Sequence, residues 1–421
     1  MGSFATALSG LNAAQSMLAT ISNNLANMNT DGYKDQTLTF GDIYAQATQT
    51  NGSGDPIQTG NGVTVSGTDS NFGEGNLSAT GISSNMALSG NGFFVTQGVS
   101  GLPNYTRSGD FTTNSSGFLV TPGGELVMGF PATNGVVNAS AALQPLNVAN
   151  GLTSPPVAST TIGVTANLDS NTAVGGTATA SSLTVYDSLG AAHTLTVSYT
   201  MTAPNTWTYS VSIPSTDVTG GTGTSTVVGS GTLNFNSSGQ LTSTSAVVPI
   251  SIPNLADGAA SMSLTGPFGT ATNPTITQTA GASATSATST DGYASGTLSS
   301  YAIQPDGTVE GTFSSGQTLA LGQVAVATFA NNQGLSNVGN NSYQATTASG
   351  QAVVGVAGTG GKGTIVGGSV EESNVNIASE FSNLIVAQQS YGANAKSITT
   401  LQQLSQAALA MIQLATAIQV S

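Results

Sequence analysis

The sequence contains no cysteine and only one histidine, His193. Without cysteine the chain cannot form disulfides, zinc–thiolate sites or iron–sulfur clusters, and it has no thiol nucleophile. A single histidine excludes a multi-histidine metal site, and no GxSxG nucleophile motif accompanies it. We interpret His193 as a side chain of a turn or a strand edge. The sequence therefore predicts no catalytic residue, no cofactor-binding residue and no metal ligand.

Charge is scarce and mostly of one sign. The 421 residues include 18 acidic and 4 basic ones, for a net charge of −14. Four basic residues cannot neutralise a row of phosphates, so we expect no nucleic-acid binding. Acids such as Asp169, Asp187 and Glu310 are scattered and do not define a glycosidase pair. These features indicate that the chain is not an enzyme.

Long apolar runs are also missing. No stretch reaches the roughly 18 apolar residues that a membrane-spanning helix needs, so no insertion into a membrane is expected. No basic residue precedes Lys34, so the charged start of a secretory signal peptide is absent. If the chain is exported, we expect a route that cleaves no signal peptide.

The two ends of the chain carry apolar residues at helical spacing and almost no charge. Residues 1–30 have no charged side chain and no histidine, and from Phe381 onward only Lys396 is charged. Alternating steps of three and four residues predict the apolar seam of a coiled coil. An ordinary surface helix keeps a charged face, so we expect these helices to be buried on most sides. The N-terminal seam positions are Phe4, Ala7, Leu11, Ala14, Leu18, Ile21, Leu25 and Met28.

The C-terminal pattern has one polar position, Gln388, and a phase slip of three residues before Leu401, which is typical of a stammer. The N-terminal helix should end near Gly32, because glycine fits a left-handed position after a helix. The C-terminal seam positions are Ile377, Phe381, Leu384, Tyr391, Ala395, Ile398, Leu401, Leu404, Ala408, Met411, Ala415 and Ile418.

Short β-like runs separated by Gly, Asn and Ser turns fill the chain between the two ends. No amphipathic helix alternates with them, which argues against a parallel βαβ sheet. The sequence predicts a mainly β, multi-domain fold in which discontinuous antiparallel β domains are nested between long coiled-coil helical termini. Linkers are predicted at 153–161 and 270–290, which are rich in Ser, Thr and Ala. The predicted domains are 1–32 with 371–421 (polymerisation), 33–70 (connector), 71–145 with 301–370 (inner β domain) and 146–300 (inserted outer β domain).

Several motifs along the chain resemble those of the bacterial flagellar rod and hook family, in the same order. The resemblance covers both helical ends, the inner β domain and an inserted outer domain of the kind found in hook members. The motifs are ALSGLNAA (7–14), NNLAN (23–27), TDGYK (30–34), LSGNGFF (88–94), YTRSGDF (105–111), VYDSLG (185–190) with His193, DGTVEG (306–311), LGQVA (321–325), NNSY (340–343), EESNV (371–375) and YGANAK (391–396).

The resemblance implies a structural subunit that polymerises into a tubular, flexible hook with a central export channel, which transmits motor torque in bacterial motility. It implies that the terminal helices mediate self-assembly and that the chain lies outside the cell, in the hook and basal body. Implied partners are other copies of the chain, the distal rod protein, the hook–filament junction protein, the hook cap and the flagellar type III export apparatus. Two alternatives remain: a distal-rod-type axial protein, or a secreted β-rich adhesin or surface-layer protein.

Overall fold

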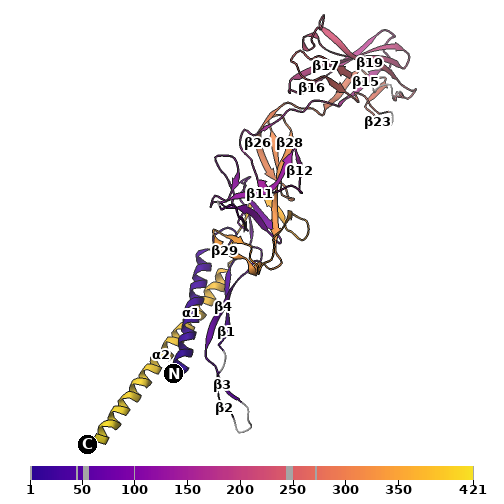
Figure 1. Cartoon of the computed structure of the whole chain (residues 1–421). Helices are drawn as coiled ribbons and strands as arrows, with labels where there is room; N and C mark the ends of the chain where they lie inside the picture. Colours follow the sequence, from indigo (N-terminus) through magenta and orange to yellow (C-terminus); the bar gives the residue numbers. More distant parts are fainter. Residues whose placement is uncertain are drawn as a thin grey trace. The chain divides into compact units, whose positions relative to one another are not determined.

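A computed structural model describes residues 2–43, 46–50, 56–98, 100–242, 250–270 and 273–420 (Figure 1). In this part of the chain, strands predominate and the α-helices are α1 (Gly2–Ala26) and α2 (Ile377–Val420). The fold is therefore mainly β, with several separate sheets, as predicted. Neither of these helices is long and apolar enough to span a membrane.

The chain divides into two compact units. The terminal unit comprises residues 1–149, 301–310 and 320–421, and the inserted unit comprises 150–300 and 311–319. Both units are therefore assembled from segments that are discontinuous in sequence. The finer division into four domains stays a prediction.

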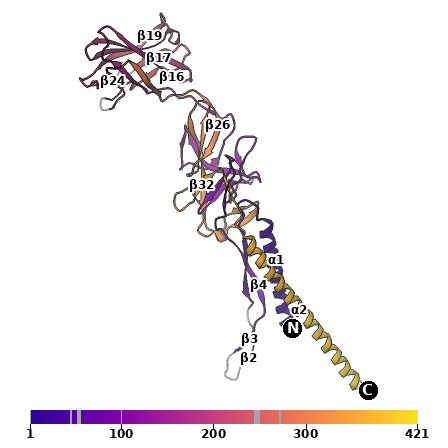
Figure 2. The ribbon, with the colours of Figure 1, turned by 180° about the vertical axis from the view of Figure 1, so that it is seen from behind.

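The terminal unit pairs its two helices side by side and antiparallel, with both chain ends at the same end of the pair (Figures 1 and 2). Gly10 of α1 lies directly against the Asn394 side chain of α2. Helix α1 ends at Ala26, earlier than predicted, and turns occupy the residues up to Gly32. The Asn27 side-chain nitrogen donates to the Asn23 carbonyl at 2.9 Å, and the Thr30 hydroxyl donates to the Asn27 side-chain oxygen at 3.2 Å. Local side-chain bonds of this kind compete with continued helix, which accounts for the early end of α1.

A β-hairpin follows α1 and contacts it. Strand β1 (Gln36–Asp42) pairs antiparallel with β4 (Val63–Ser70), with an irregularity between Thr39 and Phe40. The Ser9 hydroxyl of α1 accepts a hydrogen bond from the backbone N–H of Val63 at 3.2 Å. A second hairpin extends from the first and pairs β2 (Gln46–Thr50) with β3 (Pro56–Thr59).

The remaining strands of the terminal unit form its β core. Strands β28, β11, β7, β8, β30 and β29 lie in this order in one sheet, and two apolar clusters pack on it around Phe94 and Phe93. Their bounds, with those of the flanking strands, are β5 (Leu77–Ala79), β6 (Met86–Ser89), β7 (Phe93–Gln97), β8 (Pro103–Thr106), β9 (Thr112–Thr113), β10 (Leu119–Val120), β11 (Leu126–Thr133), β12 (Val136–Val137), β13 (Gln144–Pro145), β28 (Thr318–Thr328), β29 (Ser336–Gly339), β30 (Ser342–Gln344), β31 (Val353–Val356), β32 (Thr364–Gly367) and β33 (Ser369–Glu371).

The inserted unit is built on the antiparallel sheet β16-β17-β18-β19 and the three-stranded sheet β24-β15-β25. In β18 every second side chain is buried, including Trp207 and Tyr209, because successive residues of a strand face opposite sides. The bounds are β14 (Thr153–Ser154), β15 (Ile162–Asp169), β16 (Thr177–Tyr186), β17 (Ala192–Ala203), β18 (Thr206–Pro214), β19 (Ser225–Asn234), β20 (Ile250–Ile252), β21 (Met262–Leu264), β22 (Gly269–Thr270), β23 (Asn273–Pro274), β24 (Ile276–Thr279) and β25 (Ala284–Thr290), with β26 (Gly296–Ile303) and β27 (Thr308–Phe313) near its end.

Two predictions about this unit were wrong. Within 270–290, expected as a linker, strands β24 and β25 flank β15, and Ile276 is fully buried in the core. The Ser/Thr-rich composition reflects an exposed sheet face, since threonine fits strands well. The pairing of β15 with β24 is parallel, whereas only antiparallel pairing was expected. A parallel pair needs a long connection, and the whole β16–β23 segment supplies it.

Candidate assembly surface and its buried support

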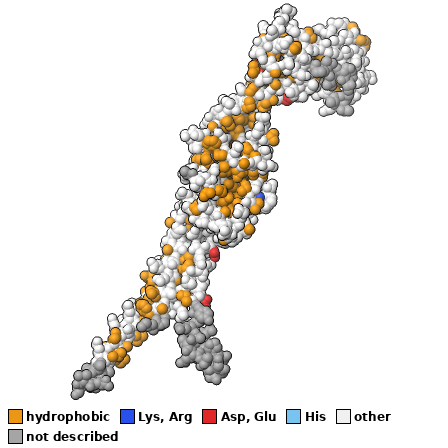
Figure 3. All heavy atoms as spheres, viewed as in Figure 1, with side chains coloured by type: hydrophobic (Ala, Val, Ile, Leu, Met, Phe, Trp, Pro, Cys, Tyr) orange, Lys and Arg blue, Asp and Glu red, His pale blue; other side chains and the backbone are white. Residues whose placement is uncertain are grey.

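The helices of the terminal unit expose many apolar side chains along much of their length. Figure 3 shows these side chains in orange along the described part of α2. Leu404 is 62% exposed and Met411 is 69% exposed, which is unusual for large apolar residues. The other large exposed apolar residues of the two helices are Phe4, Leu8, Ile377, Phe381, Ile385, Val386, Tyr391, Leu409 and Ile412.

The face of α2 that packs against α1 differs from the predicted seam. Ala387 is fully buried, whereas its neighbour Gln388, expected in the seam, is exposed. Of the predicted seam, Leu384, Ala395, Ile398 and Leu401 are nevertheless among the less exposed positions of α2. All the less exposed positions among the described side chains of α2 are Glu380, Leu384, Ala387, Asn394, Ala395, Ile398 and Leu401.

The predicted assembly residues therefore fall into two groups. In α1, Ile21 is buried, and Leu11, Leu18 and Leu25 are half-buried. In α2, Leu384, Ile398 and Leu401 are half-buried, and α1 and α2 contact each other within one chain. The exposed group consists of Phe4 and Met28 at the N-terminal end and Ile377, Phe381, Tyr391, Leu404 and Met411 in α2; the side chain of Ile418 lies outside the described residues.

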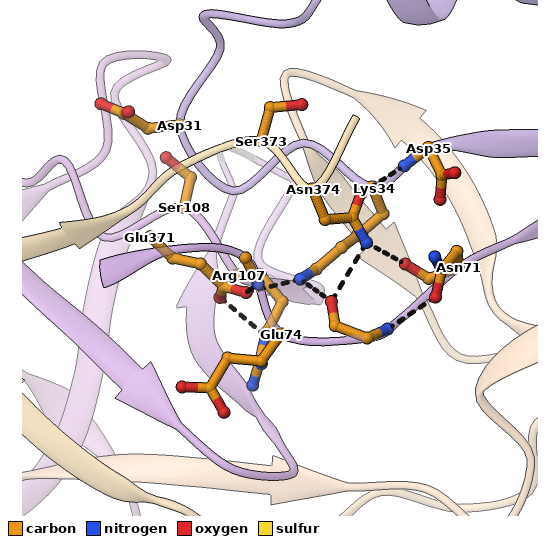
Figure 4. Close-up of polar contacts among 12 residues, drawn as sticks. Asp31, Lys34, Asp35, Asn71, Glu74, Arg107, Ser108, Glu371, Ser373 and Asn374 are labelled. Atoms are coloured by element: carbon orange, nitrogen blue, oxygen red, sulfur yellow. Dashed lines mark hydrogen bonds and ion pairs between the residues drawn. The ribbon is translucent and has the colours of Figure 1, made fainter. Parts of the chain in front are cut away.

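A buried ionic junction of Lys34, Arg107 and Glu371 fastens the helices to the β core (Figure 4). The Lys34 ammonium lies 2.6 Å from Oε1 of Glu371, and Nε of Arg107 lies 3.1 Å from Oε2. The Glu371 side chain is fully buried. One carboxylate thus faces two of the chain's four basic side chains.

Backbone groups complete the junction. Lys34 donates to the carbonyl oxygen of Gly73 at 2.7 Å, and the N–H of Gly75 donates to Glu371 at 2.7 Å. Arg107 donates through Nη1 to the carbonyls of Gly90 and Gly92 at 2.8 and 2.9 Å. Buried charges need this kind of pairing and hydrogen bonding to be tolerated. Burial lowers the pKa of Lys34, although Glu371 opposes the shift.

Asn24 joins the end of α1 to the start of β1. Its side-chain oxygen accepts hydrogen bonds from the Tyr33 hydroxyl and the Gln36 N–H, both at 3.0 Å. Its amide nitrogen donates to the Gln36 carbonyl at 2.8 Å. Burial, with the nearby charges of Asp35 and Glu380, raises the pKa of Tyr33 to about 12, so the hydroxyl stays a donor.

Asn374 fixes the segment that leads into α2. Its side-chain oxygen accepts from the Asp35 N–H at 2.8 Å, and its nitrogen donates to the carbonyls of Asn71 and Gly73 at 2.8 and 3.1 Å. Close packing adds to this, because a Cβ on Gly32 would come within 2.4 Å of the Ser108 nitrogen. The chain segments before and after the β core are therefore held at one place.

Sequence reasoning quoted Lys34, Arg107 and Glu371 within motifs but did not predict that they meet. Asn24 and Asn374 were also missed as positioning residues. The available signal was the scarcity of basic residues, since three of the four (Lys34, Arg107 and Lys396) lie inside the quoted motifs. The contact itself depends on strand pairing that periodicity does not specify.

Four family models match the chain in order. They are described as flagella basal body rod protein (residues 4–34), flagellar hook protein FlgE/F/G D1 domain (87–167), flagellar basal body protein FlaE D2 domain (159–293) and flagellar basal body rod FlgEFG protein C-terminal (366–411). Together they cover both the helical ends and the β units.

Full-length relatives carry the same description. The chain is 35% identical to flagellar hook protein FlgE of Salmonella typhimurium, across 96% of this chain and 98% of that one. It is 36% identical to the Escherichia coli hook protein, across 95% and 98%. The crystal structure of Helicobacter pylori hook protein FlgE2 shares the fold, with a TM-score of 0.50 and 16% identity over 68% of this chain and 98% of that one.

Proposed function

The chain belongs to the flagellar hook protein family and is a structural, non-enzymatic subunit of the hook, and from that premise we propose that helices α1 and α2 supply the contacts between subunits. The occupant of their exposed apolar face is then the helix pair of another copy of this chain. The coiled-coil arrangement predicted from the heptads is part of this proposal.

The observation that carries the proposal is the exposed apolar face of α2, which has almost no charge. An exposed apolar stripe on a helix normally indicates a partner. From Phe381 onward Lys396 is the only charged side chain, so a second uncharged helix can pack there without burying unpaired charge. Repetition of this contact along a polymer gives the stability that one chain lacks.

The buried junction supports the same role. It fastens the helices to the β core at several points, so force applied to the helices reaches the core through ionic and backbone contacts. We propose that the helices line the inner part of the tube and that their uncharged polar residues let exported chains of either sign pass without electrostatic trapping.

The proposed partners are other copies of this chain, the distal rod protein, the hook–filament junction protein, the hook cap and the flagellar type III export apparatus. The proposed location is outside the cell, with export that leaves no cleaved signal peptide. The named relatives are all hook proteins, so neither a distal-rod protein nor an adhesin is supported.

Leu404→Asp tests the assembly face. Leu404 is mostly exposed, so the variant chain should fold normally but fail to form hooks, because each subunit contact would bury a carboxylate. Gln403→Asp adds the same charge at the adjacent exposed position and should be milder. Electron microscopy of sheared appendages and motility plates measure the outcome. Normal hooks from Leu404→Asp would refute the proposed face.

A further inference from the structure

The only histidine of the chain lies among three aspartates of the inserted unit. His193 is in β17, Asp187 follows β16, Asp217 ends the short helix η1 (Ser215–Asp217), and Asp257 lies between β20 and β21. Nε2 of His193 is 3.1 Å from Oδ2 of Asp187 and 3.9 Å from Oδ2 of Asp257. Nδ1 is 3.0 Å from Oδ2 of Asp217. Both ring nitrogens therefore face carboxylates.

Each aspartate is held through one oxygen and presents the other to the ring. Oδ1 of Asp187 accepts from the N–H groups of Leu189 and Ala191 at 2.8 and 2.9 Å. Oδ1 of Asp257 accepts from Ala259 at 3.0 Å, and Oδ1 of Asp217 accepts from the Thr216 hydroxyl at 3.1 Å. The three Oδ2 atoms are left to converge on His193.

The segments that carry these aspartates are tied together by other bonds. The N–H of Ala260 donates to the Ser188 hydroxyl at 3.0 Å, which joins the Asp257 loop to the Asp187 turn. The N–H of Ala256 donates to the Asp217 carbonyl at 3.0 Å. Gly190 gives the turn its shape, with φ of +86° and a Cβ position 2.7 Å from Pro156. The cluster is thus positioned by its backbone.

No basic side chain of the inserted unit balances these carboxylates. Lys34, Arg107, Lys362 and Lys396 all belong to the terminal unit. Three of the inserted unit's aspartates surround one imidazole, and the Asp187 side chain is fully buried. Even a doubly protonated ring leaves the group with an excess of negative charge.

The arrangement also assigns the ring nitrogens different roles. Asp217 is placed to accept the proton of Nδ1, which leaves the lone pair of Nε2 directed at two carboxylates. Atoms of His193, Asp187 and Asp257 all lie within 4.8 Å of one another. Such a set of acceptors needs a cation, or an added proton, at its centre.

We propose that His193, Asp187 and Asp257 bind a divalent cation of the zinc class, with Asp217 as the residue that orients the imidazole. Zinc accepts imidazole nitrogen and carboxylate oxygen, and three protein ligands leave a fourth position for water. A carboxylate on the other ring nitrogen is the usual support of a metal-bound histidine. The imidazole ligand makes calcium or magnesium a poorer match, since these prefer oxygen.

This site revises the expectation that the chain binds no metal, and it does not depend on the hook assignment. A bound cation would link the β16–β17 turn to the β20–β21 loop directly, and η1 would join the same site through the contact of Asp217 with the imidazole. The competing state is a doubly protonated His193 that donates to Asp187 and Asp217 with no metal. Burial opposes this protonation, but bonds to Asp217 and Asp187 raise the pKa of His193.

The full-length chain allows a direct test, because its single imidazole gives unambiguous NMR signals. After treatment with a chelator, Zn²⁺ is added at neutral pH while the His193 ring signals and the calorimetric heat are followed. We expect one Zn²⁺ per chain, a shift of the ring signals, and a rise in melting temperature of roughly 5–10 °C at a hundredfold excess over Kd. Unchanged ring signals at saturating Zn²⁺ would overturn the proposal in favour of the protonated state.

Variants localise the binding. Asp257→Asn should fold, because this side chain is 33% exposed, and it should weaken Zn²⁺ binding at least about tenfold by loss of a ligand. Asp217→Asn should weaken binding by about 10–100-fold through the ring orientation. Asp169→Asn, which changes an aspartate outside the cluster, should leave affinity unchanged. Equal affinity in Asp257→Asn and the parent chain would place the ion elsewhere and refute the site.

Discussion

Lys34 and Glu371 are separated by 337 positions in the chain, yet their side chains form an ion pair of 2.6 Å with no exposed surface on either one. Arg107 lies on the second oxygen of the same carboxylate. Glu371 is therefore the anion that pairs directly with two buried cations, and its loss should matter more than that of any exposed acid.

Glu371→Ala should lower the free energy of unfolding by about 3–5 kcal/mol, because Lys34 and Arg107 would stay buried without a counter-charge. Glu372→Ala is the matched control, since this neighbouring acid is exposed, and it should cost less than about 0.5 kcal/mol. Denaturant unfolding followed by circular dichroism measures both. Similar losses for the two variants would show that the junction contributes little.

Glu380 should make the docking of α2 depend on pH. Burial raises the pKa of this carboxyl above its ordinary 4.5, and the charge of Asp35 adds to the shift, against a hydrogen bond to Asn24. The folded chain therefore holds the Glu380 proton more tightly than the unfolded chain does. The stability that this protonation adds is fully present below pH 4.5, and it is lost as the pH rises through the raised pKa of Glu380 in the folded chain.

Glu380→Gln removes this ionisation and should stabilise the chain near neutral pH, with a smaller difference from the parent chain near pH 4 (about half a unit below the unfolded pKa). Unfolding curves recorded across this pH range compare the two. Glu372→Gln serves as the control, because its carboxylate is exposed. A constant difference across the range would mean that Glu380 does not titrate in the folded contact.

Leu18→Asp should abolish hook assembly and leave the β units folded. Leu18 is half-buried beside Ile21, and residues 1–30 contain no basic side chain that could neutralise an added carboxylate. Leu18→Met conserves volume and should cost less than about 1.5 kcal/mol. Circular dichroism of the purified chain and electron microscopy of cells give the two readouts. Hooks of normal length from Leu18→Asp would disprove the buried face.

Ile276→Ala should destabilise the inserted unit by about 2–5 kcal/mol, because it empties a fully buried position of the core. Thr288→Ala in neighbouring β25 changes an exposed side chain and should shift stability within about 0.5 kcal/mol. Thermal unfolding of the full chain reports both. A tolerated Ile276→Ala would restore the linker interpretation of this segment.

Periodicity predicted the two helices and most of the strand-rich middle, because each pattern is local. It could not choose between Ala387 and Gln388 as the buried position, since neighbouring phases of an uncharged helix fit a heptad almost equally well. Glu380 shows the same limit: its burial follows from the approach of α1 near Asn24, a tertiary contact without a sequence period.

The ionic junction and the His193 cluster could not be predicted for the same reason, because both depend on tertiary contacts. Lys34, Arg107 and Glu371 come from three distant segments, and their meeting depends on which strands pair. His193 looked isolated because its acidic neighbours other than Asp187 lie 24 and 64 positions further along the chain. Composition did contain a usable hint, since charged side chains this rare are seldom placed without a partner.

The long separation of Lys34 from Glu371 also imposes an order on biosynthesis. A ribosome has completed most of the chain before the partner of Lys34 exists, so the N-terminal segment stays unfastened while the rest is made. Contacts of such high sequence separation form slowly. A chain that ends before Glu371 would keep Lys34 and Arg107 without their shared counter-charge, so the junction is among the last contacts that a growing chain can complete.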